Sequence, residues 1–242
     1  LAPAAPNYYF VPQDIGLLAE YERGWKVTEA MPVNVLGFQT HRDDFAIDMD
    51  STALRNRIAE MRDEQLNDYE FSQKYELKDN RDWQLQKARQ SLRRDDGLKK
   101  KLSQIAYRPF DLRYGYFSEV AMDYPRKELI QHVAGKQNIC IGIGRAGNAV
   151  SEEVWSLQRV AIYPLDANVF RRGGVNVFPL WLYPNETPAD LLEAAETEKR
   201  PNLAPEFVAD LQKTQGQPVS PDNTLAYLYA VLYTPGYRTR YA

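Results

Sequence analysis

The stretch of the sequence that most constrains the fold is residues 107–118, which read YRPFDLRYGYFS. Pro109 fixes its own φ near about −65° and pushes the residue before it toward extended backbone. Large side chains then recur at every second position, at Leu112, Tyr114 and Tyr116. This alternation is typical of a strand with one buried face. The stretch therefore predicts a strand that follows a turn at Pro109.

The same stretch carries two arginines, Arg108 and Arg113, with Asp111 between them. A guanidinium on an extended, aromatic-rich segment matches both phosphates and guanine edges. The alternative is a structural ion pair that Asp111 closes with one of the two arginines. The pattern alone favours the structural pair, because such pairs outnumber arginines that read bases. For Arg108 we expect that pair, with Asp111 as its partner.

The order of the elements predicts an α+β fold, because helices cluster and strands do not alternate regularly with them. A helical block precedes the central stretch, mixed strands follow it, and the C-terminal part is helical. Helices are predicted within residues 15–25, from 51, and at 71–77, 81–98, 124–135, 187–199, 205–213 and 221–233. Extended segments are predicted at 7–11, 25–30, 45–49, 138–144, 160–165 and 175–183.

The predicted helix at residues 81–98 has one apolar stripe, and its basic side chains are expected on the other faces. The stripe consists of Trp83, Leu85, Ala88 and Leu92. The basic residues are Lys87, Arg89, Arg93 and Arg94.

The chain has 242 residues, enough for one large domain or two small ones. We expect a single domain over residues 1–242, with a possible division into a helix-rich part, 1–104, and a mixed part, 105–242. The sequence begins at Leu1 and ends inside YRTRYA. These ends predict that the domain is a piece of a longer polypeptide.

Charge is distributed unevenly along the chain, although the net charge is only −3. Residues 1–73 hold 6 Lys and Arg against 13 Asp and Glu, a net charge of −7. Residues 74–172 hold 19 against 12, a net charge of +7, and residues 173–242 hold 5 against 8, a net charge of −3. A basic middle between acidic flanks is a candidate polyanion-binding face. The alternative is charge scattered over solvated helices.

No apolar run approaches the roughly 20 residues of a membrane-spanning helix, and no charged-then-apolar leader is present. Cys140 is the only cysteine, so an intrachain disulfide and a cysteine metal cluster are excluded. Its apolar neighbours predict an inert buried thiol. These features favour the reducing cytoplasm and no membrane partner.

One motif suggests a nucleotide site. Gly142, Gly144 and Gly147 follow an apolar strand and match GxGxxG, and Asp166 lies about twenty residues on. The next segment, residues 150–159, is short and places acidic residues where a pyrophosphate would bind. No βαβ unit completes a nucleotide fold, which counts against this interpretation.

Other catalytic signals are weak. The two histidines, His41 and His132, are not spaced with carboxylates as metal ligands usually are. The sequence has no GxSxG, no HExxH and no phosphate-binding GxxxxGK[ST]. We therefore expect neither a catalytic centre nor a metal site in these residues.

Six segments, taken together and in order, resemble one family. They are TxRD at 40–43, RDW at 81–83, YRPFDLR at 107–113, FPLWLYP at 178–184, PNLAPEF at 201–207 and YLYAVLYTPGYRTRYA at 227–242. The set resembles the C-terminal target-recognition region of Type ISP restriction-modification enzymes, and it covers essentially the whole chain.

That resemblance implies a function. In the family, one polypeptide joins a nuclease, an ATP-driven translocase, an adenine-N6 DNA methyltransferase and a terminal domain that recognises DNA. The NPPY-type methyltransferase motif and the translocase phosphate loops are absent from this sequence. The chain is then expected to bind double-stranded DNA without catalysing a reaction. S-adenosylmethionine, ATP and Mg²⁺ would bind to other domains of the parent polypeptide.

The resemblance also selects candidate DNA contacts on the predicted loops and strand ends. Arginines in loops would position the domain through phosphates, and amides would read adenine by paired hydrogen bonds. The candidates are Gln39, Thr40, Arg42, Arg113, Arg145, Arg171, Arg172 and Asn176.

Three hypotheses remain open. The first is a DNA sequence-recognition domain. The second is a scaffold that docks to the methyltransferase and translocase with little DNA contact, for which the aromatic helix at residues 227–233 would be suited. The third is a nucleotide-binding enzyme that uses residues 142–147.

Overall fold

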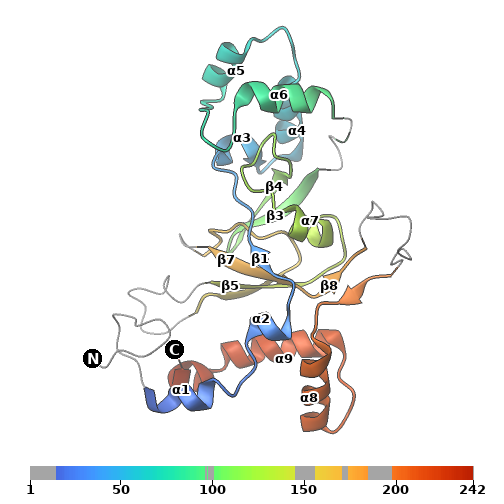
Figure 1. Cartoon of the computed structure of the whole chain (residues 1–242). Helices are drawn as coiled ribbons and strands as arrows, with labels where there is room; N and C mark the ends of the chain where they lie inside the picture. The colour runs from blue at the N-terminus through green and yellow to red at the C-terminus, as the bar shows by residue number, and fades with distance from the viewer. Residues whose placement is uncertain are drawn as a thin grey trace.

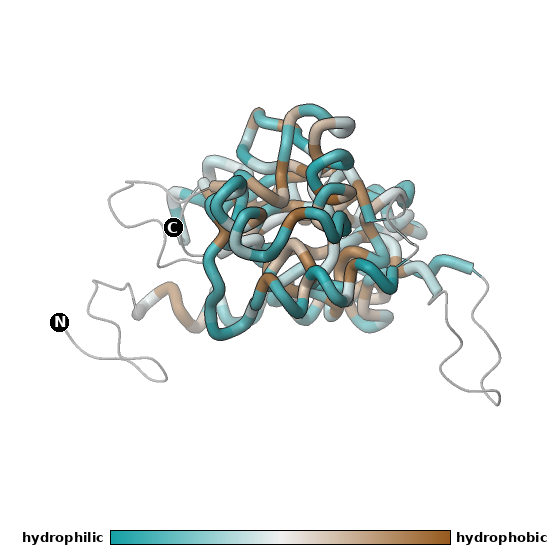
Figure 2. The backbone as a smooth tube through the Cα atoms, turned by 90° about the horizontal axis from the view of Figure 1, so that it is seen from above, coloured by the Kyte–Doolittle hydropathy of each residue, from teal (hydrophilic) through white to brown (hydrophobic). Residues whose placement is uncertain are grey.

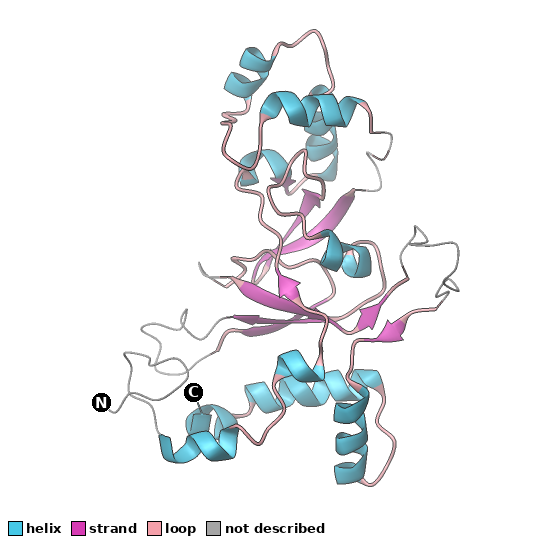
Figure 3. Ribbon diagram, in the orientation of Figure 1, coloured by secondary structure: helices cyan, strands magenta, loops and turns pink. Residues whose placement is uncertain are grey.

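The computed structural model describes residues 15–95, 97, 101–144, 156–170, 174–184 and 198–241. Strands gather in the middle of the molecule, and most helices lie at its two ends (Figure 3). All strand pairs within the sheets are antiparallel. The predicted α+β class is confirmed.

The larger sheet has four strands in the order β1-β7-β5-β6. They are β1 (Val35–Leu36), β5 (Cys140–Gly144), β6 (Gln158–Ala161) and β7 (Val175–Pro179). Successive side chains in a strand point to opposite faces. Cys140 and Val177 therefore pack on one face with α7 (Lys127–Val133). Ile141 and Phe178 pack on the other face with the two helices α8 (Pro205–Gln215) and α9 (Pro221–Tyr233).

The smaller sheet has the order β2-β4-β3. Its strands are β2 (Ile47–Asp48), β3 (Leu102–Arg108) and β4 (Asp111–Tyr116). Four helices lie over it at one end of the molecule (Figure 1): α3 (Asp43–Ala46), α4 (Ser51–Glu60), α5 (Asp68–Lys74) and α6 (Leu85–Arg93). Ile105 and Tyr116 of the hairpin are fully buried with Phe45, Leu54 and Leu92 of the helices.

A short segment, residues 164–167, joins the two sheets. On one side it pairs with Phe38, whose N–H donates to Leu165 O at 3.2 Å and whose carbonyl accepts from Ala167 N at 2.9 Å. On the other side it pairs with Ala106 of β3, whose N–H donates to Pro164 O at 2.9 Å. We call residues 164–167 the seam. It brings the loop after β1 and the β3–β4 hairpin together.

The remaining elements lie at the opposite end of the molecule or at its side (Figure 1). They are α1 (Ile15–Tyr21), α2 (Val27–Ala30), α10 (Pro235–Tyr241) and the two-stranded sheet of β8 (Trp181–Leu182) and β9 (Arg200–Pro201). Arg240 of α10 forms an ion pair with Glu20 of α1 at 2.5 Å, so residues far apart in the sequence lie side by side here.

Several predicted elements differ in detail. Residues 27–30 form a helix and not an extended segment, and Glu29 caps its start by accepting from the backbone N–H of Lys26 at 3.3 Å and from its Nζ at 3.1 Å. The helix predicted at 81–98 begins only at Leu85, and β3 was not predicted. The prediction at 7–11 and most of that at 187–199 lie outside the described residues. The division of the chain near residue 104 stays a prediction.

Hydrophilic and hydrophobic residues alternate along most of the described backbone (Figure 2). Among the described helices, none has the length and apolarity needed to cross a membrane.

Candidate nucleic-acid interface

Tyr107 of β3 is the centre of a polar network beside the seam. Its hydroxyl donates to Asp43 Oδ2 at 2.6 Å. The guanidinium carbons of Arg108 and Arg113 lie 3.7 and 4.3 Å from the centre of its ring. Burial, followed by the hydrogen bond to Asp43, raises the pKa of Tyr107 to about 12. Tyr107 is therefore a permanent donor, and two cations stack on it.

The ion pairs of the central stretch differ from the expected one. Asp111 accepts from Arg113, with Nε at 2.9 Å and Nη2 at 2.7 Å from Oδ2. Arg108 instead lies 3.3 Å from Asp166 of the seam. The expected pair of Arg108 with Asp111 is therefore wrong. Asp111 and Arg113 are two positions apart and share a strand face, and a register shift before Arg108 turns that residue toward the seam.

The loop between β1 and α3 is held by its own polar residues. The Thr40 hydroxyl donates to Asp43, and its oxygen accepts from Arg42 N at 3.1 Å. The Arg42 side chain is only 6% exposed, pairs with Asp123 at 2.5 Å and lies 4.0 Å from the centre of the Trp83 ring. Thr40 and Arg42 thus shape the loop from inside and do not face solvent.

His41 is the exposed member of this loop. Its side chain is about half exposed, and its Nδ1 lies 2.6 Å from Asp123 Oδ2. Its φ is 55°, a left-handed backbone conformation that residues other than glycine rarely adopt. Burial raises the pKa of Asp123, but the hydrogen bonds from Arg42 and His41 outweigh it and leave that pKa below its usual value. Asp123 therefore stays ionised and anchors both residues.

An open pocket of about 320 Å³ lies where this loop meets the seam. Its lining is polar throughout: Gln39, Thr40, His41, Asp43, Asp166 and Asn168. Gln39 is half-buried, and its backbone pairs with that of Tyr124 at 3.0 Å in both directions. The pocket can therefore offer an amide and an imidazole to a hydrogen-bonding ligand.

Asp166 is the buried carboxylate of this pocket. Burial is the largest influence on it and raises its pKa to about 6. The Asn168 N–H, 2.6 Å away, and Arg108 oppose that shift, whereas Asp43 adds to it. The carboxyl group therefore changes charge close to neutral pH.

We expect Asp166→Asn to remove a pH dependence of stability. The pKa of about 6 in the folded protein exceeds the ordinary aspartate value of 3.8, so the folded state binds the proton more tightly. The contribution of protonated Asp166 to the free energy of unfolding is complete below about pH 4. It is lost as the pH rises through 6, and the loss is about 3 kcal/mol at most. Urea unfolding between pH 4 and 8 measures the effect as the difference between wild type and variant. If the free energies of unfolding of wild type and Asp166→Asn changed with pH in parallel, the prediction would be contradicted.

The structure brings half of the candidate residues together. Gln39, Thr40, Arg42 and Arg113 belong to one network through Asp43 and Tyr107. Asn176 is half-buried on β7, where it is the register partner of Leu36 of β1. Arg145, Arg171 and Arg172 lie outside the described residues.

Sequence reasoning missed several members of the network: His41, Asp43, Tyr107, Asp123 and Asn168. Asp123 meets His41 from 82 positions away, and no local pattern signals such a contact. The sequence did point to Tyr107, because this residue is the first of the central stretch at 107–118. It pointed to Asp43 too, since that residue ends the TxRD motif.

The glycine motif has a packing role. Gly142 and Gly144 lie within β5, between two antiparallel neighbours, and not in a loop that follows a parallel strand. A Cβ on Gly142 would lie 2.8 Å from the Leu165 side chain, and one on Gly144 would lie 2.6 Å from Leu157. These glycines let side chains pack on the sheet, so the nucleotide-binding hypothesis is contradicted.

The other candidate reactive groups are structural. Cys140 is buried, and burial raises the pKa of its thiol to about 12, as expected for an inert cysteine. His132 is buried, and its Nδ1 accepts from Tyr183 N at 3.1 Å. Within the described residues, no group of three or more metal-ligating side chains occurs.

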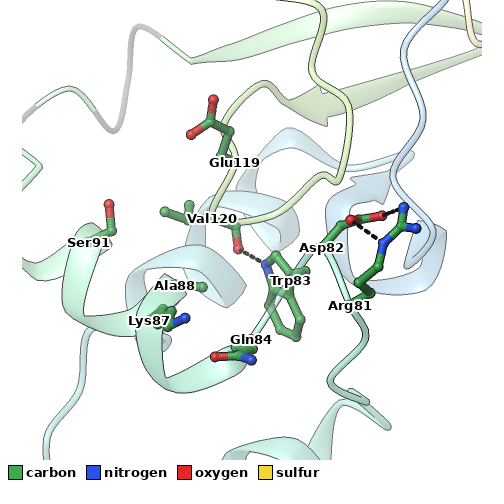
Figure 4. A pocket seen from close by; sticks show the side chains of 9 residues that line it. All are labelled: Arg81, Asp82, Trp83, Gln84, Lys87, Ala88, Ser91, Glu119 and Val120. Carbon is green, nitrogen blue, oxygen red and sulfur yellow. Dashed lines mark hydrogen bonds and ion pairs between the residues drawn. The ribbon is translucent and has the colours of Figure 1, made fainter.

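The RDW motif lines a second pocket, of about 230 Å³, beside α6 (Figure 4). The Arg81 guanidinium faces its neighbour Asp82, at 2.9 and 3.0 Å. The indole N–H of Trp83 donates to Val120 O at 3.1 Å. The motif therefore braces the start of α6 against the segment after β4, and its two charged residues, Arg81 and Asp82, pair with each other.

A family model described as the Type ISP C-terminal specificity domain matches residues 29–242. No curated protein sequence matches the chain.

Three solved structures share the fold. A nuclease-deletion mutant of the Type ISP enzyme LlaGI, in complex with a DNA substrate mimic, is 19% identical with a TM-score of 0.63 and covers 100% of this chain. DNA-bound LlaBIII, an ATP-dependent Type ISP restriction-modification enzyme, and the DrdV–DNA complex are each 18% identical, with TM-scores of 0.61 over 87% of this chain. The chain spans 22% of LlaGI, 13% of LlaBIII and 20% of DrdV. By its family match, the chain belongs to the Type ISP C-terminal specificity domains.

Proposed function

We propose that this domain recognises a DNA sequence on behalf of a longer Type ISP restriction-modification polypeptide. It would position double-stranded DNA for adenine-N6 methylation and ATP-dependent restriction by other domains. The observation that carries the proposal is the match to the family's specificity domain over residues 29–242. S-adenosylmethionine, ATP and Mg²⁺ would bind to those other domains.

The geometry supports different roles for the candidate residues: base contact, phosphate contact and support of the loop. Gln39 lines an open polar pocket, and its amide can make the paired hydrogen bonds that read adenine. Arg113 is 31% exposed and uses Nε and Nη2 for Asp111, which leaves Nη1 for a phosphate. Thr40 and Arg42 would act by holding the loop. The roles of Arg145, Arg171, Arg172 and Asn176 in DNA contact remain part of the proposal.

A salt-dependent titration against random duplex DNA tests the proposal. The logarithm of the binding constant is expected to fall with the logarithm of salt concentration, by about 0.9 per phosphate contact. We expect a slope that reflects several contacts, steeper when the methyltransferase domain is joined to the chain. Arg113→Ala and Arg171→Ala should each reduce the slope by about 1.

Arg55→Ala is the matched control, because Arg55 is an exposed arginine on α4. It is expected to leave the slope unchanged. If neither Arg113→Ala nor Arg171→Ala altered binding, the assignment of these contacts would be wrong. If no form of the protein bound DNA, the recognition function would be rejected.

A docking scaffold is the second candidate function. Tyr227 and Tyr233 of α9 are 45% and 56% exposed, and the Tyr233 ring stacks on Tyr229. Exposed aromatic side chains of this kind suit contact with another domain. Binding of the separate methyltransferase domain without DNA, lost in Tyr227→Ala, would support this function.

A further inference from the structure

The tip of the β3–β4 hairpin presents an aromatic side chain to solvent. Phe110 is 98% exposed, more than any other large hydrophobic residue in the described part of the chain. A ring that is almost fully exposed contributes no buried apolar area to the stability of the fold. The hairpin itself gains nothing from this ring.

The hairpin holds that ring on a braced support. Arg108 and Asp111 are register partners, so only Pro109 and Phe110 form the turn. The proline ring restricts the backbone there. Below the turn, Tyr107 is anchored to Asp43 by its hydroxyl and is covered by two guanidiniums. Phe110 is therefore presented in a fixed place and not on a mobile loop.

An arginine for which the described residues supply no anionic partner lies beside the ring. The Arg159 guanidinium carbon is 5.2 Å from the centre of the Phe110 ring. Its Nε is buried and has no hydrogen-bond acceptor within the described residues. The residue as a whole is only partly buried, so its guanidinium can form a charge-assisted hydrogen bond to an anionic oxygen that a ligand brings.

The exposed aromatic ring lies next to a guanidinium that has no anionic partner among the described residues. This pair matches the chemistry of DNA, which has stacked bases inside and phosphates outside. Apolar side chains that enter between base pairs unstack and kink the duplex, while arginine contacts the phosphates. We propose that Phe110 inserts into the base stack of bound duplex DNA and that Arg159 binds a phosphate beside the inserted ring. This inference rests on the proposed function and adds a positioning element to it.

The experiment compares two short random-sequence duplexes, one fully paired and one with a central mismatch. A mismatch lowers the cost of unstacking, so wild type is expected to bind the mismatched duplex more tightly. Phe110→Ala should bind the paired duplex about tenfold more weakly, in line with the loss of one stacking contact. It should also lose the preference for the mismatch. Phe110→Trp should keep both properties.

Variants of Arg159 distinguish the contribution of its charge to DNA binding from that of the Phe110 ring. Arg159→Ala should reduce the salt slope by about 1, whereas Arg159→Lys and Phe110→Ala should leave that slope unchanged. Tyr69→Ala is the matched control, because Tyr69 is also a strongly exposed aromatic residue, 73% exposed on α5. It should affect neither affinity nor mismatch preference.

Three outcomes would overturn the inference. Wild-type affinity and mismatch preference in Phe110→Ala would reject insertion while leaving DNA recognition in place. Equal weakening on both duplexes, together with loss of methyltransferase binding in the absence of DNA, would make Phe110 a docking residue. Failure of wild type itself to bind either duplex would reject the proposed function and the insertion with it.

Discussion

Replacing Arg89 with methionine is expected to cost about 3–5 kcal/mol of unfolding free energy, because three backbone carbonyls lose their donor at about 1–3 kcal/mol each. The Arg89 side chain is 1% exposed in the core of the helical end of the domain. Its Nε donates to Met61 O at 3.0 Å, Nη2 to Leu66 O at 2.7 Å and to Asp63 O, and Nη1 to Asp68 at 2.8 Å. One guanidinium thus satisfies the turn that connects α4 to α5. Methionine fills similar space but leaves those carbonyls without donors.

Arg93→Met is the matched control, because it makes the same change one turn further along α6. Arg93 is 33% exposed, 3.7 Å from Glu64, and its one hydrogen bond to Arg62 O is long, at 3.4 Å. We expect a loss below about 1 kcal/mol, as for other exposed pairs. Urea unfolding of both variants measures the difference. Equal losses in the two variants would show that Arg89 does not brace the turn.

Arg89 also shows where sequence reasoning fails. The helical pattern placed Leu85, Ala88 and Leu92 correctly in the core. Arg89 lies on that same stripe, but its charge assigned it to the polar face. A buried arginine requires several acceptors from outside its own helix, and these come from residues 61–68, more than twenty positions earlier. No local pattern contains that information.

Elements with strong local signals could be predicted from the sequence. The bounds of α9 match the prediction at residues 221–233, because Ser220 caps the helix and Pro221 occupies its first turn. The strand β5 was predicted from its continuous apolar run. In contrast, β3 has polar Ser103 and Gln104 side by side and shows little alternation. Its identity comes from pairing with β4 over most of its length.

The candidate interface was predictable only in part. The central stretch identified the hairpin, and the TxRD motif identified the loop that faces it. The contacts between them, such as Tyr107 with Asp43 and Arg108 with Asp166, cross 64 and 58 positions of sequence. They exist because the seam brings the two segments together, and a seam made of isolated backbone pairs has no side-chain pattern.

The seam packs directly against the backbone of Gly37, where an added side chain would clash. Gly37→Ala is expected to destabilise the domain by about 3 kcal/mol, through overpacking and lost backbone hydrogen bonds. A Cβ at this position would lie 2.5 Å from Leu165 O and 2.7 Å from Ala167 N. Both atoms belong to backbone, so no side chain can move aside. The methyl group must push residues 165–167 away from Phe38, which breaks the pairing that joins the two sheets.

Gly236→Ala is the matched control, because it replaces a glycine with alanine at a position where no clash is expected. Gly236 lies in α10, where the nearest atom to an added Cβ, Thr234 Cγ2, is 4.0 Å away. Alanine there should stabilise the domain by up to about 1 kcal/mol, because it favours the helix. The two variants should thus shift the urea midpoint in opposite directions. If Gly37→Ala unfolded at the wild-type midpoint, the close approach at the seam would not be needed for the two sheets to pack. If it unfolded early and also lost the pH dependence of Asp166, the seam would be shown to hold the pocket as well as the fold.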